Sequence, residues 1–144
     1  MGVLCLLMPH LAQAQFTTIP DPQFEQFLFD QGIDLTAGDG RVLTARIETV
    51  TSLSLTGSNS TTYPIGNLTG LQDFRDLETF FFQNVTIIGF DFSQNEKLQS
   101  VVIDNATTLG VTFGTPKQDL TVLTITNTLG ASSLNLSALP NLTL

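Results

Sequence analysis

The chain repeats one eight-residue pattern three times, as LETFFFQN (residues 77–84), LQSVVIDN (residues 98–105) and LTVLTITN (residues 120–127). Each segment begins with leucine, carries apolar residues three and five positions later, and ends with asparagine. With Leu142, the leading leucines lie 21, 22 and 22 residues apart. A second apolar pair follows in each unit: Phe90/Phe92, Val111/Phe113 and Leu134/Leu136. Self-similarity at this period indicates a repeat architecture.

The apolar spacing within each segment is typical of a β-strand. Side chains alternate between the two faces of a strand, so Phe80 and Phe82 would face one way and Phe81 the other. Equivalent strands of successive repeats would stack into a parallel sheet, since no single repeat can bury its own apolar face. The second apolar pair recurs with the same period, which favours two sheets across a thin core. We therefore predict a β-rich solenoid with repeats of 21–22 residues and parallel sheets.

Composition and charge narrow the classes of partner. The chain has 144 residues, with Lys+Arg 5, Asp+Glu 13 and a net charge of −8. This charge repels nucleic acid and anionic membranes. Hydrophobic residues make up 42%, with no apolar run long enough for membrane insertion, so one soluble domain is expected. A protein, glycan or cation partner is favoured, and composition leaves the oligomeric state open.

Residues 1–14 resemble a secretory signal peptide. They combine a short apolar core at residues 3–8 with an Ala-Gln-Ala cleavage pattern at residues 12–14, although a basic start is missing. A secreted or cell-surface protein is therefore predicted. Removing this segment would remove Cys5 and His10, the only cysteine and histidine. Disulfides, Cys- or His-ligated zinc, thiol nucleophiles and Ser-His-Asp triads would then be excluded, and we predict no cofactor and no metal ion.

Residues 15–49 are predicted to form an N-terminal helical cap. Asp21 can cap a helix that has Pro22 in its first position and ends at Gly32. A second short helix is expected over residues 44–49, where apolar residues recur at helical spacing. Such a cap would cover the first edge of the sheet, since an open strand edge promotes association.

The loop at residues 34–40 invites comparison with a helix-loop-helix calcium site. That pattern places oxygen-bearing side chains at positions one, three and five before a glycine. With Gly40 as the glycine, the three positions hold Leu35, Ala37 and Asp39, of which only the aspartate fits. We predict a turn built from glycine and aspartate, with a weak cation site as the alternative.

The first repeat, residues 50–76, points to a protein family. Its strand carries Leu53 and Leu55, and apolar residues then recur at every third position, as in 3₁₀-like turns: Ile65, Leu68, Leu71, Phe74 and Leu77. Together with IPDPQFEQ (residues 19–26), this pattern resembles the internalin-like leucine-rich repeats of secreted bacterial surface proteins. The resemblance implies a leucine-rich-repeat solenoid over residues 50–144.

One departure from the family pattern concerns asparagine. The consensus L-x-x-L-x-L-x-x-N has asparagine at position nine, whereas Asn84, Asn105 and Asn127 stand at position eight. Counted from Ile87, Asn95 alone falls at position nine. The sequence therefore argues against a continuous buried ladder of asparagines that would hydrogen-bond successive repeats.

The outward side chains of the predicted strands suggest where a partner binds. Phe81 and Val102 share a column on neighbouring repeats, and Val122 is close by. An apolar centre with a polar rim has the composition of a binding patch. The predicted partner-binding residues are Glu78, Phe81, Gln83, Gln99, Val102, Asp104 and Val122. We predict an exported leucine-rich-repeat module that binds a protein or glycan through this face; the alternative is that another segment covers Phe81.

Two further interpretations concern the whole protein. Parallel β-helix enzymes that act on polysaccharides place carboxylates on adjacent turns. Here Asp91 aligns with Thr112 and Asn135, and Asp104 aligns with uncharged residues, so no column repeats an acid and no enzyme is predicted. Residues 142–144 begin another unit, so we expect the solenoid to continue. The module would then be a non-catalytic part of a larger surface protein.

Overall fold

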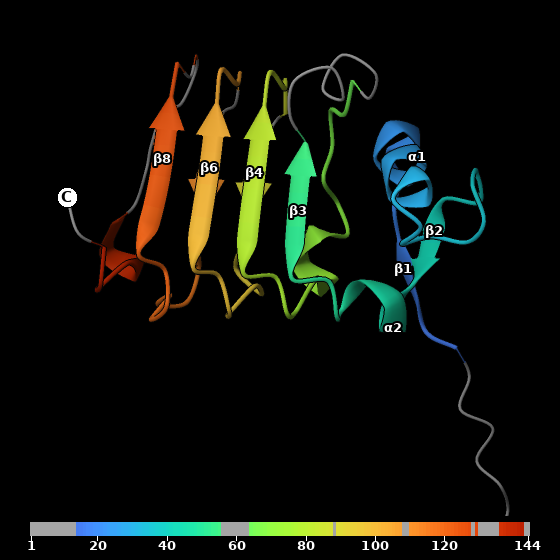
Figure 1. The fold of residues 1–144 in the computed structure, drawn as a ribbon, viewed down its shortest axis with the longest axis horizontal. Coiled ribbons are helices and arrows are strands. Elements are labelled where there is room, and N and C mark those ends of the chain that lie inside the picture. The colour runs from blue at the N-terminus through green and yellow to red at the C-terminus, as the bar shows by residue number, and fades with distance from the viewer. Residues whose placement is uncertain are drawn as a thin grey trace, which may run out of the picture.

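The computed structural model describes residues 14–55, 64–87, 89–107, 110–127, 129 and 136–142. The predicted signal peptide before residue 14 and the side chains of Leu134 and Leu136 lie outside the described residues. Within them, no helix has both the length and the apolar character needed to span a bilayer. The described part combines one antiparallel strand pair, two parallel sheets and two α-helices (Figure 1).

The main sheet has four parallel strands in the order β3-β4-β6-β8 (Figure 1). These strands are β3 (Ser52–Leu55), β4 (Thr79–Gln83), β6 (Ser100–Asp104) and β8 (Val122–Thr126). Phe80 pairs with Val101, and Val101 pairs with Leu123. The alignment predicted from the three eight-residue segments is therefore confirmed.

Two columns of apolar side chains point inward from this sheet. They are Leu53, Phe80, Val101 and Leu123, and Leu55, Phe82, Ile103 and Ile125. The first three members of each column are buried, as predicted. Leu123 and Ile125 are only partly buried, because β8 is the last strand of the sheet. Ile125 packs against the core without being fully buried in it, unlike Phe82 and Ile103.

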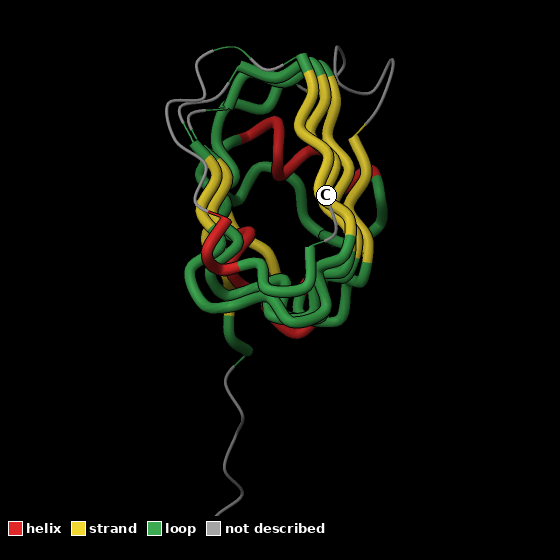
Figure 2. Tube along the Cα trace, turned by 90° about the vertical axis from the view of Figure 1, so that its left-hand side faces the viewer, coloured by secondary structure: helices red, strands yellow, loops and turns green. Residues whose placement is uncertain are grey.

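A second, smaller parallel sheet pairs β5 (Phe90–Asp91) with β7 (Val111–Thr112). Figure 2 shows the strands of the two sheets on opposite sides of the interior, with successive repeats superposed. The apolar pairs Phe90/Phe92 and Val111/Phe113 are buried between the sheets. Isolated parallel bridges also join Thr86 to Thr107 and Thr107 to Leu129.

The segment before β4 carries the apolar residues that recur at every third position. All five are buried: Ile65, Leu68, Leu71, Phe74 and Leu77. One 3₁₀ turn, η1 (Leu71–Asp73), lies within it, and Gly70 precedes this turn with a φ of 106°. A Cβ at Gly70 would overlap the Ile19 side chain and lie 3.1 Å from the Thr18 carbonyl oxygen. Glycine is required there by both backbone conformation and space.

The N-terminal part contains β1 (Phe16–Thr18), α1 (Pro22–Asp30), β2 (Arg41–Leu43) and α2 (Thr44–Ile47). The start of α1 is confirmed, because Asp21 Oδ1 accepts hydrogen bonds from the backbone N–H groups of Gln23 and Phe24. Helix α2 ends two residues earlier than expected. The prediction of a purely helical segment was incomplete, since β1 and β2 form an antiparallel pair. Three-residue strands are too short to show alternation in the sequence.

The N-terminal part packs against the first repeat, beyond β3 in Figure 1. Asp21 Oδ2 accepts hydrogen bonds of 2.8 Å from the backbone N–H groups of Gly66 and Asn67. The rings of Phe24 and Phe74 stack with their centroids 6.3 Å apart. The apolar side chains of both parts form one core cluster.

The asparagines at position eight of the repeat are exposed, whereas the asparagine at position nine is buried. Asn84, Asn105 and Asn127 are exposed and end β4, β6 and β8 with φ values of 57°, 49° and 49°. Left-handed backbone is most accessible to glycine and asparagine, which explains this column. Asn95 is fully buried, and its Nδ2 donates to the carbonyls of Leu71 and Phe74.

Lys117 lies 22 residues after Asn95 and is also fully buried. Its Nζ donates to the carbonyl of Ser93 at 3.1 Å, so a lysine crosses between repeats where an asparagine would continue the ladder. Burial lowers the pKa of the Lys117 ammonium from its ordinary value. Among the described residues the buried asparagine ladder is thus interrupted, as predicted.

Candidate binding face

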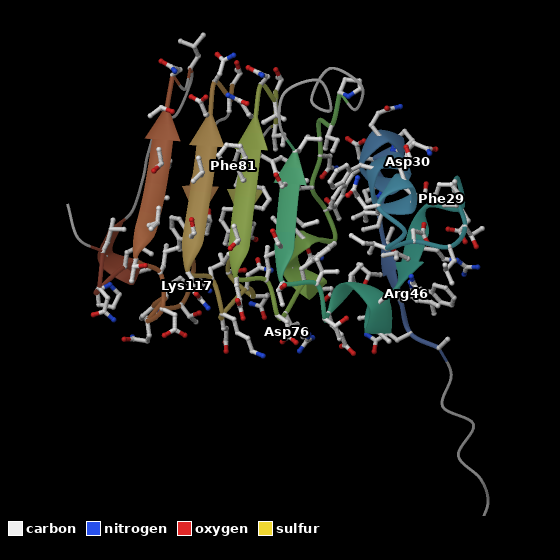
Figure 3. The ribbon with its side chains drawn as sticks, viewed as in Figure 1. Phe29, Asp30, Arg46, Asp76, Phe81 and Lys117 are labelled. Atoms are coloured by element: carbon white, nitrogen blue, oxygen red, sulfur yellow. The ribbon has the colours of Figure 1, made fainter. Side chains whose placement is uncertain are left out.

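The outward side chains of β3, β4, β6 and β8, with Glu78 and Gln99 just before two of these strands, form a surface that we call the sheet face. It faces the viewer in Figure 3, where Phe81 is labelled on β4. Its central row is fixed by the strand register and consists of Ser54, Phe81, Val102 and Thr124. Alternation of side chains places this row outside because the residues on either side of it are in the core.

An apolar pair occupies the middle of the sheet face. Phe81 and Val102 are direct register partners on β4 and β6 and are both partly buried. Val122 is 45% exposed, but it pairs with Ser100 and so lies one row away from Val102. Strands in a sheet are about 4.8 Å apart, which brings Phe81 and Val102 into contact range. The structure thus joins two of the three predicted apolar residues and sets Val122 diagonally beside them.

A hydrogen-bonded polar rim lies at the C-terminal ends of the strands. Asp104 Oδ2 accepts from Gln83 Nε2 at 2.8 Å. Asp104 Oδ1 accepts from Thr126 Oγ1 at 2.6 Å and from Asn127 Nδ2 at 3.2 Å. The predicted partner-binding residues did not include Thr126, which aligns with Asp104 in the repeat, or Asn127, which follows it. Three neighbouring strand ends are thereby cross-linked.

Hydrogen bonds determine the charge state of Asp104. The Thr126 hydroxyl, then the Gln83 amide, hold the pKa of Asp104 below its ordinary value. A depressed carboxyl pKa contributes stability that is complete above the unfolded-state value of about 3.9 and is lost as the pH falls through the folded pKa. The rim carboxylate is therefore charged throughout the neutral range.

This charge state can be measured directly. In an NMR titration of side-chain carboxyl carbons, we expect the midpoint of Asp104 to lie below about 3.9 and to move toward that value in Thr126→Val, because the strongest hydrogen bond is lost. Thr124→Val, one position away on the sheet face, is the matched control and should leave the midpoint unchanged. A wild-type midpoint at or above about 3.9 would contradict the hydrogen-bonded rim.

The other predicted rim residues lie at the opposite ends of the strands. Glu78 is partly buried and Gln99 is exposed, and the Gln99 backbone N–H donates to the Glu78 carbonyl at 2.8 Å. Gln83 and Asp104 are at the far ends of the same strands. The seven predicted residues therefore do not form one cluster. They form an apolar centre between two separate polar rims.

Two shallow hollows lie away from the sheet face. One, of about 170 Å³, is lined by Asn67, Leu68, Thr69, Gln72, Gly89 and Asp91. The other, of about 250 Å³, is lined by Arg75, Asp76, Gln94, Glu96 and Lys97. Neither reaches the roughly 300–1,000 Å³ of typical small-molecule sites. The hollows give no support to a small-molecule ligand.

The described residues also contain a group of three acids that could hold a metal ion. Glu25, Asp34 and Asp39 each bring one oxygen within 4.8 Å of the others. Sequence reasoning had considered the loop at residues 34–40 alone and had missed Glu25, which comes from α1. No local sequence pattern connects a helix residue to a loop nine or more positions away.

Comparison with protein-family models, with curated proteins and with solved structures finds nothing similar. The functional argument therefore depends on the residues themselves and on the geometry of the sheet face.

Proposed function

We propose that the chain is an exported leucine-rich-repeat module of the internalin-like bacterial type, which binds a protein partner through the sheet face. The observation that carries the proposal is the apolar pair Phe81 and Val102, held in register on adjacent strands between two polar rims. The 21–22-residue spacing of the leading leucines and the parallel register of β4, β6 and β8 support a solenoid. The apolar core at residues 3–8 and the Ala-Gln-Ala pattern support export.

A protein partner suits the chemistry of this surface and would have to extend beyond it. Four strands about 4.8 Å apart and four or five residues long cover roughly 300 Å². A stable protein interface buries about 800 Å² per partner, so the partner would extend past the sheet onto the loops at both rims. Interface anchors are commonly aromatic and surrounded by polar groups that exclude water. Phe81 is an aromatic residue of this kind, and the polar residues Gln83 and Asp104 lie in the next outward row of the same two strands.

A glycan is the second candidate, favoured by the polar row at the C-terminal rim. Gln83, Asp104 and Thr126 offer an amide, a carboxylate and a hydroxyl in one line across three strands. These groups already hydrogen-bond one another, so a sugar hydroxyl would have to compete with existing bonds. This competition makes the protein partner the better supported of the two.

The charge state of Asp104 does not suit the general acid of a polysaccharide-cleaving enzyme. A polysaccharide-cleaving enzyme needs one carboxyl group with a raised pKa to act as general acid. The pKa of Asp104 is lowered by hydrogen bonds, so this group would remain ionised. Asp91 lies on the smaller sheet and uses Oδ1 to accept from the Ser93 backbone N–H. Neither carboxylate supports the enzyme alternative.

The test begins with wild-type chain applied to arrays of purified extracellular proteins and of glycans. For each ligand found, we expect Phe81→Ala to weaken binding by about 1 kcal/mol or more, roughly fivefold, because an interface anchor is removed. Surface plasmon resonance measures the affinity, and circular dichroism checks that the fold is kept. Thr112→Ala, an exposed position on the smaller sheet, is the matched control and should bind like wild type.

Two more substitutions separate the centre from the rim. Val102→Ser removes the second member of the apolar pair, and Asp104→Ala removes the rim carboxylate. A protein ligand should depend most on Phe81 and Val102, whereas a glycan should depend most on Asp104. If a ligand binds with the same affinity to all three variants, the sheet face is not its site.

A further inference from the structure

A buried acidic cluster lies in the N-terminal part, away from the sheet face. Helix α1 supplies Glu25, and the loop that follows supplies Asp34 and Asp39. Glu25 is 3% exposed and Asp34 is 6% exposed, whereas Asp39 reaches the surface. Acidic side chains are seldom buried to this extent without a partner of opposite charge.

Backbone N–H groups already donate hydrogen bonds to some of the carboxylate oxygens of the cluster. Glu25 Oε1 accepts from the N–H groups of Asp39 at 2.9 Å and Gly40 at 2.8 Å. Asp34 Oδ1 accepts from the N–H groups of Leu35 at 2.7 Å and Thr36 at 3.3 Å. Asp34 Oδ2 is buried and has no hydrogen-bond partner. Such an oxygen is rare in folded proteins and points to a missing ligand.

The neighbouring cations do not neutralise the two buried acids. Arg41 pairs with Asp39 and Lys97 pairs with Asp76, so neither of these ion pairs involves Glu25 or Asp34. The Arg46 guanidinium lies near the loop, but it donates to the backbone carbonyls of Gly32 and Ile33. Two buried carboxylates that face each other repel unless a positive charge lies between them.

We propose that Glu25, Asp34 and Asp39 bind one calcium ion. Calcium takes six to eight oxygen ligands at about 2.3–2.6 Å, so two oxygens on the same ion lie at most about 4.6–5.2 Å apart. The three acids each bring one oxygen within 4.8 Å of the others, a span that one calcium ion can bridge. Asp34 Oδ2 is the oxygen that such an ion would satisfy.

The ion would join elements that are distant in sequence. It would link α1 to the loop before β2, where the Ile19 backbone N–H already donates to the Gly40 carbonyl at 2.8 Å. Calcium would therefore stabilise the N-terminal part against unfolding. The site shares no residue with the sheet face, so either proposal can fail while the other holds.

The test is a calorimetric titration of calcium chloride into the full chain after treatment with a chelator. We expect one ion per chain, with a Kd on the order of 10⁻⁴–10⁻³ M, as in extracellular modules. At free calcium ten times the Kd, linkage predicts that Tm rises by roughly 3–8 °C. Asp34→Asn and Glu25→Gln should weaken binding at least tenfold. Asp119→Asn, an exposed acid outside the cluster, should bind calcium like wild type.

Other results would overturn the proposal. They are the absence of heat and of any Tm change up to about 10 mM calcium, tighter binding of magnesium than of calcium, or undiminished binding by Asp34→Asn. Glu25→Gln could fail to fold, because Glu25 Oε1 holds two backbone N–H groups. In that event Asp39→Asn, at the exposed member of the cluster, decides: a loss of affinity supports the three-carboxylate site, and wild-type affinity overturns it.

Discussion

Replacing Phe80 with alanine is expected to lower the free energy of unfolding by about 3–5 kcal/mol. Phe80 is fully buried and is the inward residue of β4 that meets most aromatic neighbours. Its ring centroid lies 4.2 Å from that of Phe82, 4.9 Å from that of Phe92 and 5.8 Å from that of Phe90. Alanine would leave a cavity where these rings meet.

The position of this cavity explains the size of the effect. Phe80 comes from the four-stranded sheet, whereas Phe90 and Phe92 come from the opposite side of the core (Figure 2). The rings of Phe90 and Phe92 meet that of Phe80 edge to face, at 78° and 76°. Such aromatic pairs contribute about 0.5–1.5 kcal/mol each beyond the area they bury. Loss of the ring therefore removes contacts between the sheets as well as buried surface.

Chemical denaturation of Phe80→Ala and Phe81→Ala compares the loss in free energy of unfolding at a buried and an outward phenylalanine. The two residues are adjacent and chemically identical, but Phe81 points outward and is only partly buried. We expect the Phe80→Ala loss to be at least twice that of Phe81→Ala, and Phe80→Leu to lose less than Phe80→Ala because it fills part of the cavity. A Phe80→Ala loss below about 1 kcal/mol would mean that the strand register is wrong.

The strand register was predictable because local side-chain alternation and long-range spacing agree. Phe80, Val101 and Leu123 recur at the same position of each segment, and the structure pairs them in that order. The position of Phe81 beside Val102 follows from the same alignment. Wherever a residue's place depends on period alone, the sequence contains the needed information.

Helix α1 was predictable for a different reason. Its start depends on Asp21 and Pro22, which act on the backbone of the next few residues. Strand β1 was not predictable in this way, because Phe16 pairs with Leu43, far along the chain. Short strands that are stabilised only by a distant partner leave no periodic pattern in the sequence.

The polar contacts were the least predictable part of both candidate sites. Glu25 accepts a hydrogen bond from the Asp39 backbone because a helix and a loop pack together, and Thr126 donates to Asp104 across neighbouring strands. Lys117 is buried although lysine is usually exposed, since its Nζ reaches the Ser93 carbonyl. Such contacts depend on side-chain direction and on neighbouring repeats, which residue identity alone does not determine.

Asn95 shows how much depends on one such contact. Its Nδ2 donates to the Leu71 carbonyl at 2.9 Å and to the Phe74 carbonyl at 2.8 Å, which joins two repeats inside the core. Each carbonyl also accepts a longer backbone hydrogen bond, of 3.1 Å from Phe74 and 3.2 Å from Leu77. Asn95→Ala therefore removes one hydrogen bond from each of the two carbonyls and leaves each with its backbone hydrogen bond. We expect it to lower the free energy of unfolding by about 2–3 kcal/mol, from two lost hydrogen bonds and a small cavity.

Asn95→Asp should cost more than Asn95→Ala, although it keeps the shape of the side chain. It replaces the donating NH₂ group with an oxygen that faces two carbonyl oxygens, and it places a carboxylate at a fully buried site. An unpaired buried charge costs about 3–5 kcal/mol at neutral pH. Burial raises the pKa of the introduced carboxyl above its unfolded value, so part of the loss in stability should be recovered as the pH falls and the carboxyl becomes a hydrogen-bond donor.

Gln94→Glu makes the same change of charge at the exposed neighbour and is the matched control. Its free energy of unfolding in urea denaturation should stay within about 0.5 kcal/mol of wild type. Equal losses for Asn95→Asp and Gln94→Glu would show that Asn95 is not the buried link between repeats.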